Sequence, residues 1–256
     1  MKLRKQTLLL TLGIAVSMLT VQAKDRDSDK AKDNRKEPVG QRVDSGTFGI
    51  YMNGRRVATE TFSIQQSPAG SNVVSEFKTE GTADQSVQSS ELQLGPTGDL
   101  RKYEWRESSP DKATVVVTPN DTFLIEHYTM RAEDKSQDQP FLLPVSTSIL
   151  DDYFFVHREV LAWKYLATGC RQNQGQVQCP QGQNTQFGTL NPHARSSMPI
   201  SLVFVAKEKV SIRGVDRELN HLDLKCETGD WSLWLDDQFK LVRVLVPGDN
   251  TEVLRD

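Results

Sequence analysis

The stretch SILDDYFFVHREVLAWKYLA, residues 148–167, is the segment in which the sequence predicts a helix. Ser148 is a suitable N-cap, and Asp151 and Asp152 would lie in the first turn, where the helix dipole favours negative charge. The apolar residues cover far more than one stripe of a surface helix and are Leu150, Tyr153, Phe154, Phe155, Val156, Val160, Leu161, Trp163, Tyr165 and Leu166. A helix that is apolar on most sides is expected to be buried on most sides.

The sequence before this helix has the pattern of antiparallel strands, with short alternating segments separated by turns. Phe48, Ile50 and Met52 alternate up to Asn53-Gly54, a dipeptide suited to the positive backbone angles of a tight hairpin. We predict about seven strands before residue 131, at residues 48–52, 57–64, 73–79, 87–94, 100–106, 114–117 and 122–130.

Strand patterns return after residue 199. We predict strands at residues 200–206, 210–213, 218–226, 231–235, 239–246 and 251–254, with a turn at residues 236–238. Trp231, Leu233 and Leu235 should share one face and Trp234 the other. The expected fold is mainly β: a strongly curved antiparallel sheet of about ten or eleven strands, a half-open barrel, wrapped round one long apolar helix.

Residues 168–198 are rich in Gln, Asn and Gly and are predicted to form a long loop. Cys170 and Cys179 enclose a short polar part of it. In an oxidising compartment a local disulfide is the simplest use of this pair. Cys226 is left over in a predicted strand, where we expect a small buried hydrophobic side chain.

The first 23 residues have the pattern of an export signal. Lys2, Arg4 and Lys5 precede an apolar run from Thr7 to Val21, and Ala23 provides a small residue for cleavage. Residues 24–42 are mostly charged or polar with both signs mixed, and we interpret them as a disordered linker. A single β domain is expected from residue 43 to residue 256.

An uncleaved signal that acts as a membrane anchor is the alternative for residues 1–23. The apolar run is shorter than the roughly 20 residues that span a bilayer, which favours cleavage and a soluble periplasmic or secreted protein. The first cysteine is Cys170, so the cleavage point lacks the cysteine of a lipoprotein, and we expect no transmembrane segment after cleavage. Loss of three basic residues makes the formal net charge of −3 more negative, which argues against a nucleic-acid partner.

A search for catalytic and cofactor motifs is negative. The sequence contains no nucleophile elbow, phosphate-binding loop, dinucleotide fingerprint or zinc-protease helix. His127, His157, His193 and His221 are scattered along the chain, and Cys170, Cys179 and His193 match no common zinc spacing. We therefore expect no metal, no cofactor and no enzymatic activity; a hydrolase that uses His157 with Asp151 or Asp152 ranks third among the functional hypotheses.

The closing segments Trp231-Ser232-Leu233-Trp234-Leu235-Asp236 and Lys240-Leu241-Val242-Arg243-Val244 resemble the last hairpin of LolA and LolB, the periplasmic lipoprotein carriers. The order of predicted strands and helix is similar over most of residues 43–255. This resemblance implies an open β-barrel that carries a lipid or a lipoprotein acyl chain. The chain departs from the family in its cysteine-bounded loop and in the absence of the cysteine that anchors LolB.

The first functional hypothesis is therefore a non-enzymatic binding protein for an apolar ligand, a lipid or lipoprotein acyl chain, in envelope maintenance. The side chains expected to line its site are Phe154, Phe155, Val156, Trp163 and Tyr165 on the helix and Tyr103 and Trp105 on a strand. Each of them could instead fill the core. The alternative is an interaction or structural module in which the Cys170–Cys179 loop contacts another envelope protein or the cell wall.

Overall fold

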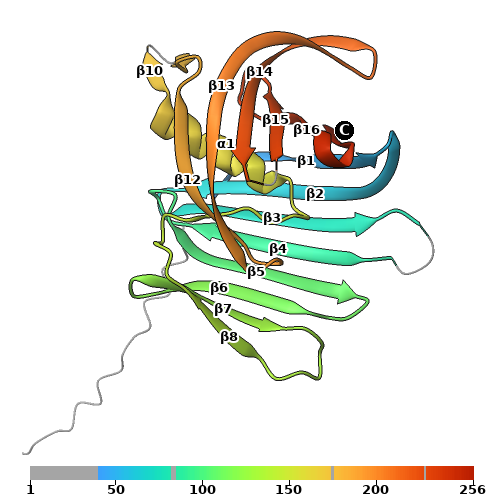
Figure 1. Ribbon diagram of the computed structural model, residues 1–256, viewed down its shortest axis with the longest axis vertical. Coiled ribbons are helices and arrows are strands. Elements are labelled where there is room, and N and C mark those ends of the chain that lie inside the picture. Colours follow the sequence, from blue (N-terminus) through green and yellow to red (C-terminus); the bar gives the residue numbers. More distant parts are fainter. Residues whose placement is uncertain (1–39, 82–84, 174–175, 228) are drawn as a thin grey trace, which may run out of the picture. The chain divides into compact units, whose positions relative to one another are not determined.

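The computed structural model describes residues 40–81, 85–173, 176–227 and 229–256 (Figure 1). The expected signal peptide, residues 1–23, and residues 24–39 of the expected linker lie outside this range. The first strand begins at Gln41, two residues before the boundary expected from composition.

The described residues form seventeen strands, one α-helix and one short 3-10 helix. The first half contains β1 (Gln41–Met52), β2 (Arg55–Ser67), β3 (Gly70–Thr79), β4 (Val87–Leu94), β5 (Leu100–Ser109), β6 (Thr114–Asn120), β7 (Phe123–Thr129), β8 (Gln137–Phe141), β9 (Ser148–Ile149) and α1 (Val156–Gly169). The second half contains β10 (Arg171–Asn173), β11 (Gln176–Gln178), β12 (Asn184–Asn191), β13 (Ser196–Ile212), β14 (Val215–Cys226), β15 (Gly229–Leu235), β16 (Leu241–Val246), η1 (Pro247–Asp249) and β17 (Thr251–Arg255).

Fifteen of these strands form one mostly antiparallel sheet, in the order β8-β7-β6-β5-β4-β3-β2-β1-β17-β16-β15-β14-β13-β12-β9. Strands β1 to β8 form one meander and β12 to β17 form a second. The pairing of β1 with β17 joins the two meanders. The pair of β12 and β9 is parallel. Within the described ranges, β8 and β9 at the two ends of the order do not pair with each other, so the sheet is open.

All seven strands expected before residue 131 are present, because alternation and turn chemistry are local signals. Asn53 and Gly54 have φ angles of 51° and 76°, as the hairpin prediction requires. Arg213 and Gly214 make a similar turn, with φ angles of 51° and 79°, between β13 and β14. The faces of β15 are also as predicted: Trp231 and Leu233 contact the main core, whereas Trp234 belongs to a second apolar cluster on the other face.

The predicted strand count of ten or eleven was too low, and the prediction of a long loop at residues 168–198 was wrong. The segment from 168 to 198 contains β10, β11 and β12 and the start of β13. Residues 196–212 form one strand instead of the two that were expected. Strand β8 was missed because its sequence, QDQPF, is polar and contains a proline; such a sequence is tolerated at a sheet edge.

The predicted helix from 148 to 167 was too long at its N-terminus. Ser148 and Ile149 pair with Thr189 and Leu190 as a short strand, so Ser148 is not an N-cap. The helix is a 14-residue segment that begins at Val156, and the residue at its N-cap position makes no side-chain capping bond. The apolar pattern extended beyond the helix because the residues before it are buried by contacts with distant parts of the chain, such as the strand pairing of Ile149 with Leu190.

Helix α1 shares one core with strands of both meanders, and Figure 1 shows it between the β2–β3 part of the sheet and strands β12–β14. Its side chains also form hydrogen bonds with the second meander. The backbone N–H of Leu241 in β16 donates to Glu159, and that of Phe204 in β13 donates to the hydroxyl of Tyr165, at 2.9 and 3.1 Å. Of the helices that the structure describes, none combines the length and the apolar character needed to span a membrane.

Candidate functional site

A cavity of about 480 Å³ lies between α1 and the ends of β2, β3 and β4. This volume is within the range of small-molecule sites in proteins. Its apolar walls are made by Ile64, Val73, Leu92, Leu94, Ile149, Val160, Leu161 and Trp163. We call it the helix–sheet cavity.

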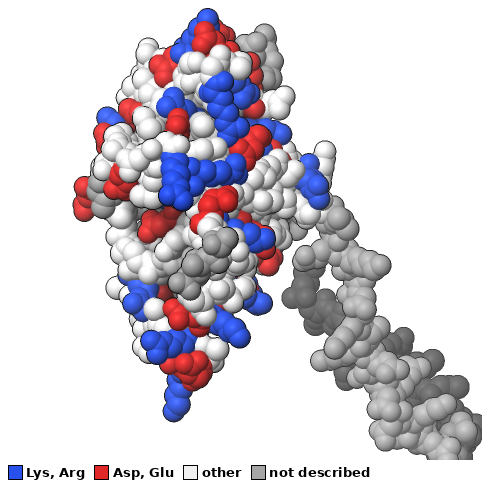
Figure 2. All heavy atoms as spheres, turned by 90° about the vertical axis from the view of Figure 1, so that its right-hand side faces the viewer, with Lys and Arg blue, Asp and Glu red and all other residues white. Residues whose placement is uncertain are grey.

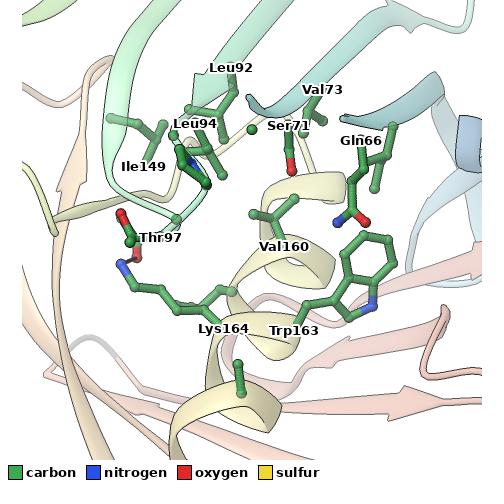
Figure 3. Close-up of a pocket in the computed structure, with 18 of the residues that line it drawn as sticks. Gln66, Ser71, Val73, Leu92, Leu94, Thr97, Ile149, Val160, Trp163 and Lys164 are labelled. Atoms are coloured by element: carbon green, nitrogen blue, oxygen red, sulfur yellow. Dashed lines mark hydrogen bonds between the residues drawn. The ribbon is translucent and has the colours of Figure 1, made fainter. Parts of the chain in front are cut away.

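One face of α1 forms a wall of the helix–sheet cavity because its residues recur at helical spacing. In Figure 3, Val160 points toward the strands, Trp163 extends toward Gln66, and the side chain of Lys164 extends toward Thr97. The indole Nε1–H of Trp163 donates to the carbonyl oxygen of Phe239 at 2.7 Å. This bond fixes the indole in the wall.

Two turns form the rim of the cavity, at residues 67–70 between β2 and β3 and at residues 95–98 between β4 and β5. Gly70 has a φ angle of 137°, and a Cβ atom there would overlap the carbonyl oxygen of Leu94. The rim therefore needs glycine at this position, because the two turns approach each other closely.

His157 lies at the cavity wall and is 1% exposed. Neither of its ring nitrogens has a hydrogen-bond partner among the described residues, and its ring packs edge-on to that of Tyr103 with centroids 5.6 Å apart. Burial lowers the pKa of His157 to about 3, so the imidazole is neutral at physiological pH.

A second cavity, of about 430 Å³, lies near the start of α1. Phe77, Tyr153, Phe155 and Trp231 provide aromatic walls, and Asp152 and Asp249 provide carboxylates. The guanidinium of Arg158 lies 4.7 Å from the centroid of Trp231 and 5.1 Å from that of Phe155. A buried cation already occupies the space behind these two rings.

The seven side chains predicted to line the ligand site are divided by the structure. Trp163 lines the helix–sheet cavity and Phe155 lines the second cavity. The other five line neither cavity and are 0% to 6% exposed: Phe154, Val156, Tyr165, Tyr103 and Trp105. These five pack in the core.

The hydrolase hypothesis placed His157 beside an acidic residue, but the histidine that contacts the Asp151 carboxylate is His193. Nδ1 of His193 lies 2.7 Å from Oδ2 of Asp151, which also accepts a hydrogen bond from the Tyr103 hydroxyl at 2.6 Å. Burial would raise the pKa of Asp151, but the bonds from His193 and Tyr103 lower it, so the carboxylate is ionised. An ionised carboxylate only accepts, so Nδ1 of His193 carries a proton.

Three buried glutamates were not found from the sequence. Glu60 in β2, Glu126 in β7 and Glu159 in α1 are each 0% exposed. Glu60 and Glu126 occupy inward positions of alternating strands, so the period of the pattern could have identified them, but their charge suggested solvent exposure. Lys164 was also missed, although it is on the same helical face as Val160.

The predicted disulfide between Cys170 and Cys179 is present, with Cα atoms 4.3 Å apart. It closes a two-stranded hairpin of β10 and β11, directly after the helix. Arg171, Gln172 and Asn173 on β10 are exposed. Cys226 is partly buried, and its thiol donates to the carbonyl oxygen of Gly229 at 2.9 Å.

On the face drawn in Figure 2, the basic and acidic side chains are intermingled, without a broad area of one sign.

No protein-family model matches the chain, and no curated protein matches it. Among solved structures, the chain is similar to a DUF1089 family protein from Pseudomonas aeruginosa. The TM-score is 0.42 and the sequence identity is 10%, over 72% of this chain and 87% of that chain.

Proposed function

We propose that the chain is a non-enzymatic, exported periplasmic protein that binds an apolar ligand, a lipid or a lipoprotein acyl chain, in the helix–sheet cavity. The observation that carries this proposal is the cavity itself, about 480 Å³ with mainly apolar walls. Burial of an acyl chain against such walls contributes about 0.8 kcal/mol for each methylene.

The proposal includes a finer description of the fold, a half-open barrel folded around α1. Contacts of α1 with both meanders support it, because Glu60 of β2 accepts from the start of the helix and Leu241 of β16 donates to Glu159. The resemblance to lipoprotein carriers and the export signal, both read from the sequence, agree with a role in handling envelope lipids.

The test is native mass spectrometry and organic extraction of the protein purified from a periplasmic extract. The wild type should carry a lipid, and Ala167→Trp should carry much less, because Ala167 is exposed at the cavity and a large side chain there would fill it. Ala132→Trp places the same side chain at an exposed position of the β7–β8 turn and should leave the lipid in place. Absence of lipid from the wild type, together with no binding of added apolar probes, would contradict the proposal.

A second candidate is an interaction module, favoured by the exposed, disulfide-closed hairpin of β10 and β11. If it is correct, replacement of Arg171, Gln172 and Asn173 by alanine should abolish capture of an envelope partner. Replacement of the exposed residues Glu133, Asp134 and Lys135 by alanine serves as the control. Equal capture by both variants and the wild type would remove this candidate.

A further inference from the structure

We propose that the ligand of the helix–sheet cavity is an anionic amphiphile, an aliphatic chain with a carboxylate or phosphate head group, and that the ammonium of Lys164 binds this head group. The inference rests on the proposed function and adds the chemical class of the ligand.

The first observation is the charge of the cavity lining. Lys164 is the one side chain with a formal charge among the described residues that line it. His157 is neutral, and the remaining polar side chains are hydroxyls, the amide of Gln66 and the indole N–H of Trp163, which donates to Phe239. A ligand in this cavity therefore meets apolar walls and a single positive charge.

The second observation is that the partners of Lys164 are neutral. Its Nζ donates to the carbonyl oxygen of Ser146 at 2.5 Å and to the hydroxyl of Ser148 at 3.2 Å. In the part of the chain that the structure describes, no carboxylate forms an ion pair with it. Asp99 interacts with Lys164 only through longer-range electrostatics. The Asp99 carboxylate accepts a hydrogen bond from Thr97 instead.

The third observation is that the Lys164 ammonium is partly buried. Burial lowers the pKa of Lys164, which means that its surroundings disfavour the charged form. An anionic head group would offset that desolvation through a charge-assisted hydrogen bond. A neutral head group would not, and a cationic head group would be repelled.

The geometry allows both ends of such a ligand to bind together. Lys164 extends toward Thr97 at the rim, while Val160, Leu92 and Leu94 line the same cavity (Figure 3). An aliphatic chain can contact these walls while its head group remains at the rim beside Nζ.

The experiment measures binding of four amphiphiles with the same chain to the wild type by titration calorimetry, each below its micelle or solubility limit: dodecanoate, dodecyl phosphate, dodecanol and dodecyltrimethylammonium. At least one anion should bind about tenfold or more tightly than dodecanol, as expected for a hydrogen bond between charged groups. Tighter binding of dodecanoate would indicate a fatty-acid source, and tighter binding of dodecyl phosphate a phospholipid source.

The matched variants are Lys164→Met, which keeps the length of the side chain without its charge, and Lys164→Arg, which keeps the charge. Lys164→Met should lose the preference for anions and still bind dodecanol, whereas Lys164→Arg should retain the preference. Binding of dodecanol shows that a variant is folded.

Three results would overturn the inference, and the third is distinguishable from the first two. If dodecanol binds the wild type as tightly as both anions, or if Lys164→Met keeps the preference, the head-group assignment is wrong and the apolar site remains. If none of the four amphiphiles binds the wild type, the proposed function fails as well.

Discussion

Glu126 is a buried carboxyl group on β7 whose two oxygens have no hydrogen-bond partner among the described residues. Burial raises its pKa to about 7, against the opposing effect of Arg195. In the unfolded chain the group titrates near the ordinary value for glutamate. The folded state therefore holds a proton that the unfolded state has lost between about pH 5 and pH 7, and stability falls as the pH rises through this window.

Glu126→Gln should remove this part of the pH dependence. At pH 8 the wild-type carboxylate is ionised and buried without a partner, so the variant should gain about 2 kcal/mol more free energy of unfolding at pH 8 than at pH 5. Urea denaturation at the two pH values measures the difference. Glu133→Gln, at an exposed position of the next turn, is the control and should show no such difference. An equal effect of Glu126→Gln at both pH values would contradict the assigned pKa.

Asp151 lies just before the helix and binds three groups. Its carboxylate accepts hydrogen bonds from Tyr103, His193 and the backbone N–H of Tyr153. An asparagine side chain there would present a donor to a site that contains only donors. Asp151→Asn should therefore cost about 3 kcal/mol of stability in thermal or urea unfolding. Asp152→Asn changes an exposed neighbour and should cost less than about 1 kcal/mol. Similar costs for both variants would show that the buried network contributes little.

The start of α1 depends on a residue about one hundred positions away. Glu60 accepts hydrogen bonds from the backbone N–H groups of Phe155 and Val156, at 2.7 and 3.2 Å, and from the hydroxyl of Ser75 at 2.7 Å. The first N–H groups of a helix have no partner within the helix. A strand side chain therefore provides the cap that the helix sequence lacks.

Glu60→Ala should leave these two amides buried without an acceptor and cost about 3 kcal/mol. Hydrogen exchange of the Phe155 and Val156 amides should become faster, and urea unfolding measures the loss of stability. Glu76→Ala, on the outward face of β3, removes an exposed carboxylate and is the matched control. Unchanged exchange at both amides would exclude the capping role.

The two meanders of the whole molecule meet where β1 pairs with β17, and one arginine connects the strands on both sides. Arg255 in β17 donates through Nη2 to both oxygens of Asp44 in β1, each at 2.7 Å, and through Nη1 to the carbonyl oxygen of Leu241 in β16 at 3.1 Å. Burial would raise the pKa of Asp44, but the neighbouring Glu159, Arg255 and Lys240 lower it. Burial and the nearby Asp44 raise the pKa of Glu159.

Arg255→Met should leave the buried carboxylate of Asp44 with Lys240 as its remaining cationic partner and cost about 3 kcal/mol in urea unfolding. Arg213→Met, the control, removes an exposed arginine that also pairs with an aspartate and should cost less than about 1 kcal/mol. Equal costs would mean that the junction of the meanders does not depend on this arginine.

The strands that the sequence predicts and those that it misses differ in their local sequence patterns. Seven of the eight strands of the first meander were predicted because each is an alternating segment bounded by a turn such as Asn53-Gly54. Strand β9, before the helix, was missed because it lies within a helix-like apolar run, and β12, after the helix, was missed because it lies within a polar loop-like run. Their pairing with each other is a contact between Ile149 and Leu190, which no local pattern reports.

The sequence by itself determined the β class, seven of the eight strands of the first meander, the existence of the helix and the Cys170–Cys179 pair, because periodicity, turn residues and short cysteine spacing act over a few residues. Tertiary structure alone decided where α1 begins, which side chains line the helix–sheet cavity and which carboxyl groups are buried. These features depend on desolvation and on hydrogen bonds between distant parts of the chain, such as Glu60 with Phe155 and Lys164 with Ser146.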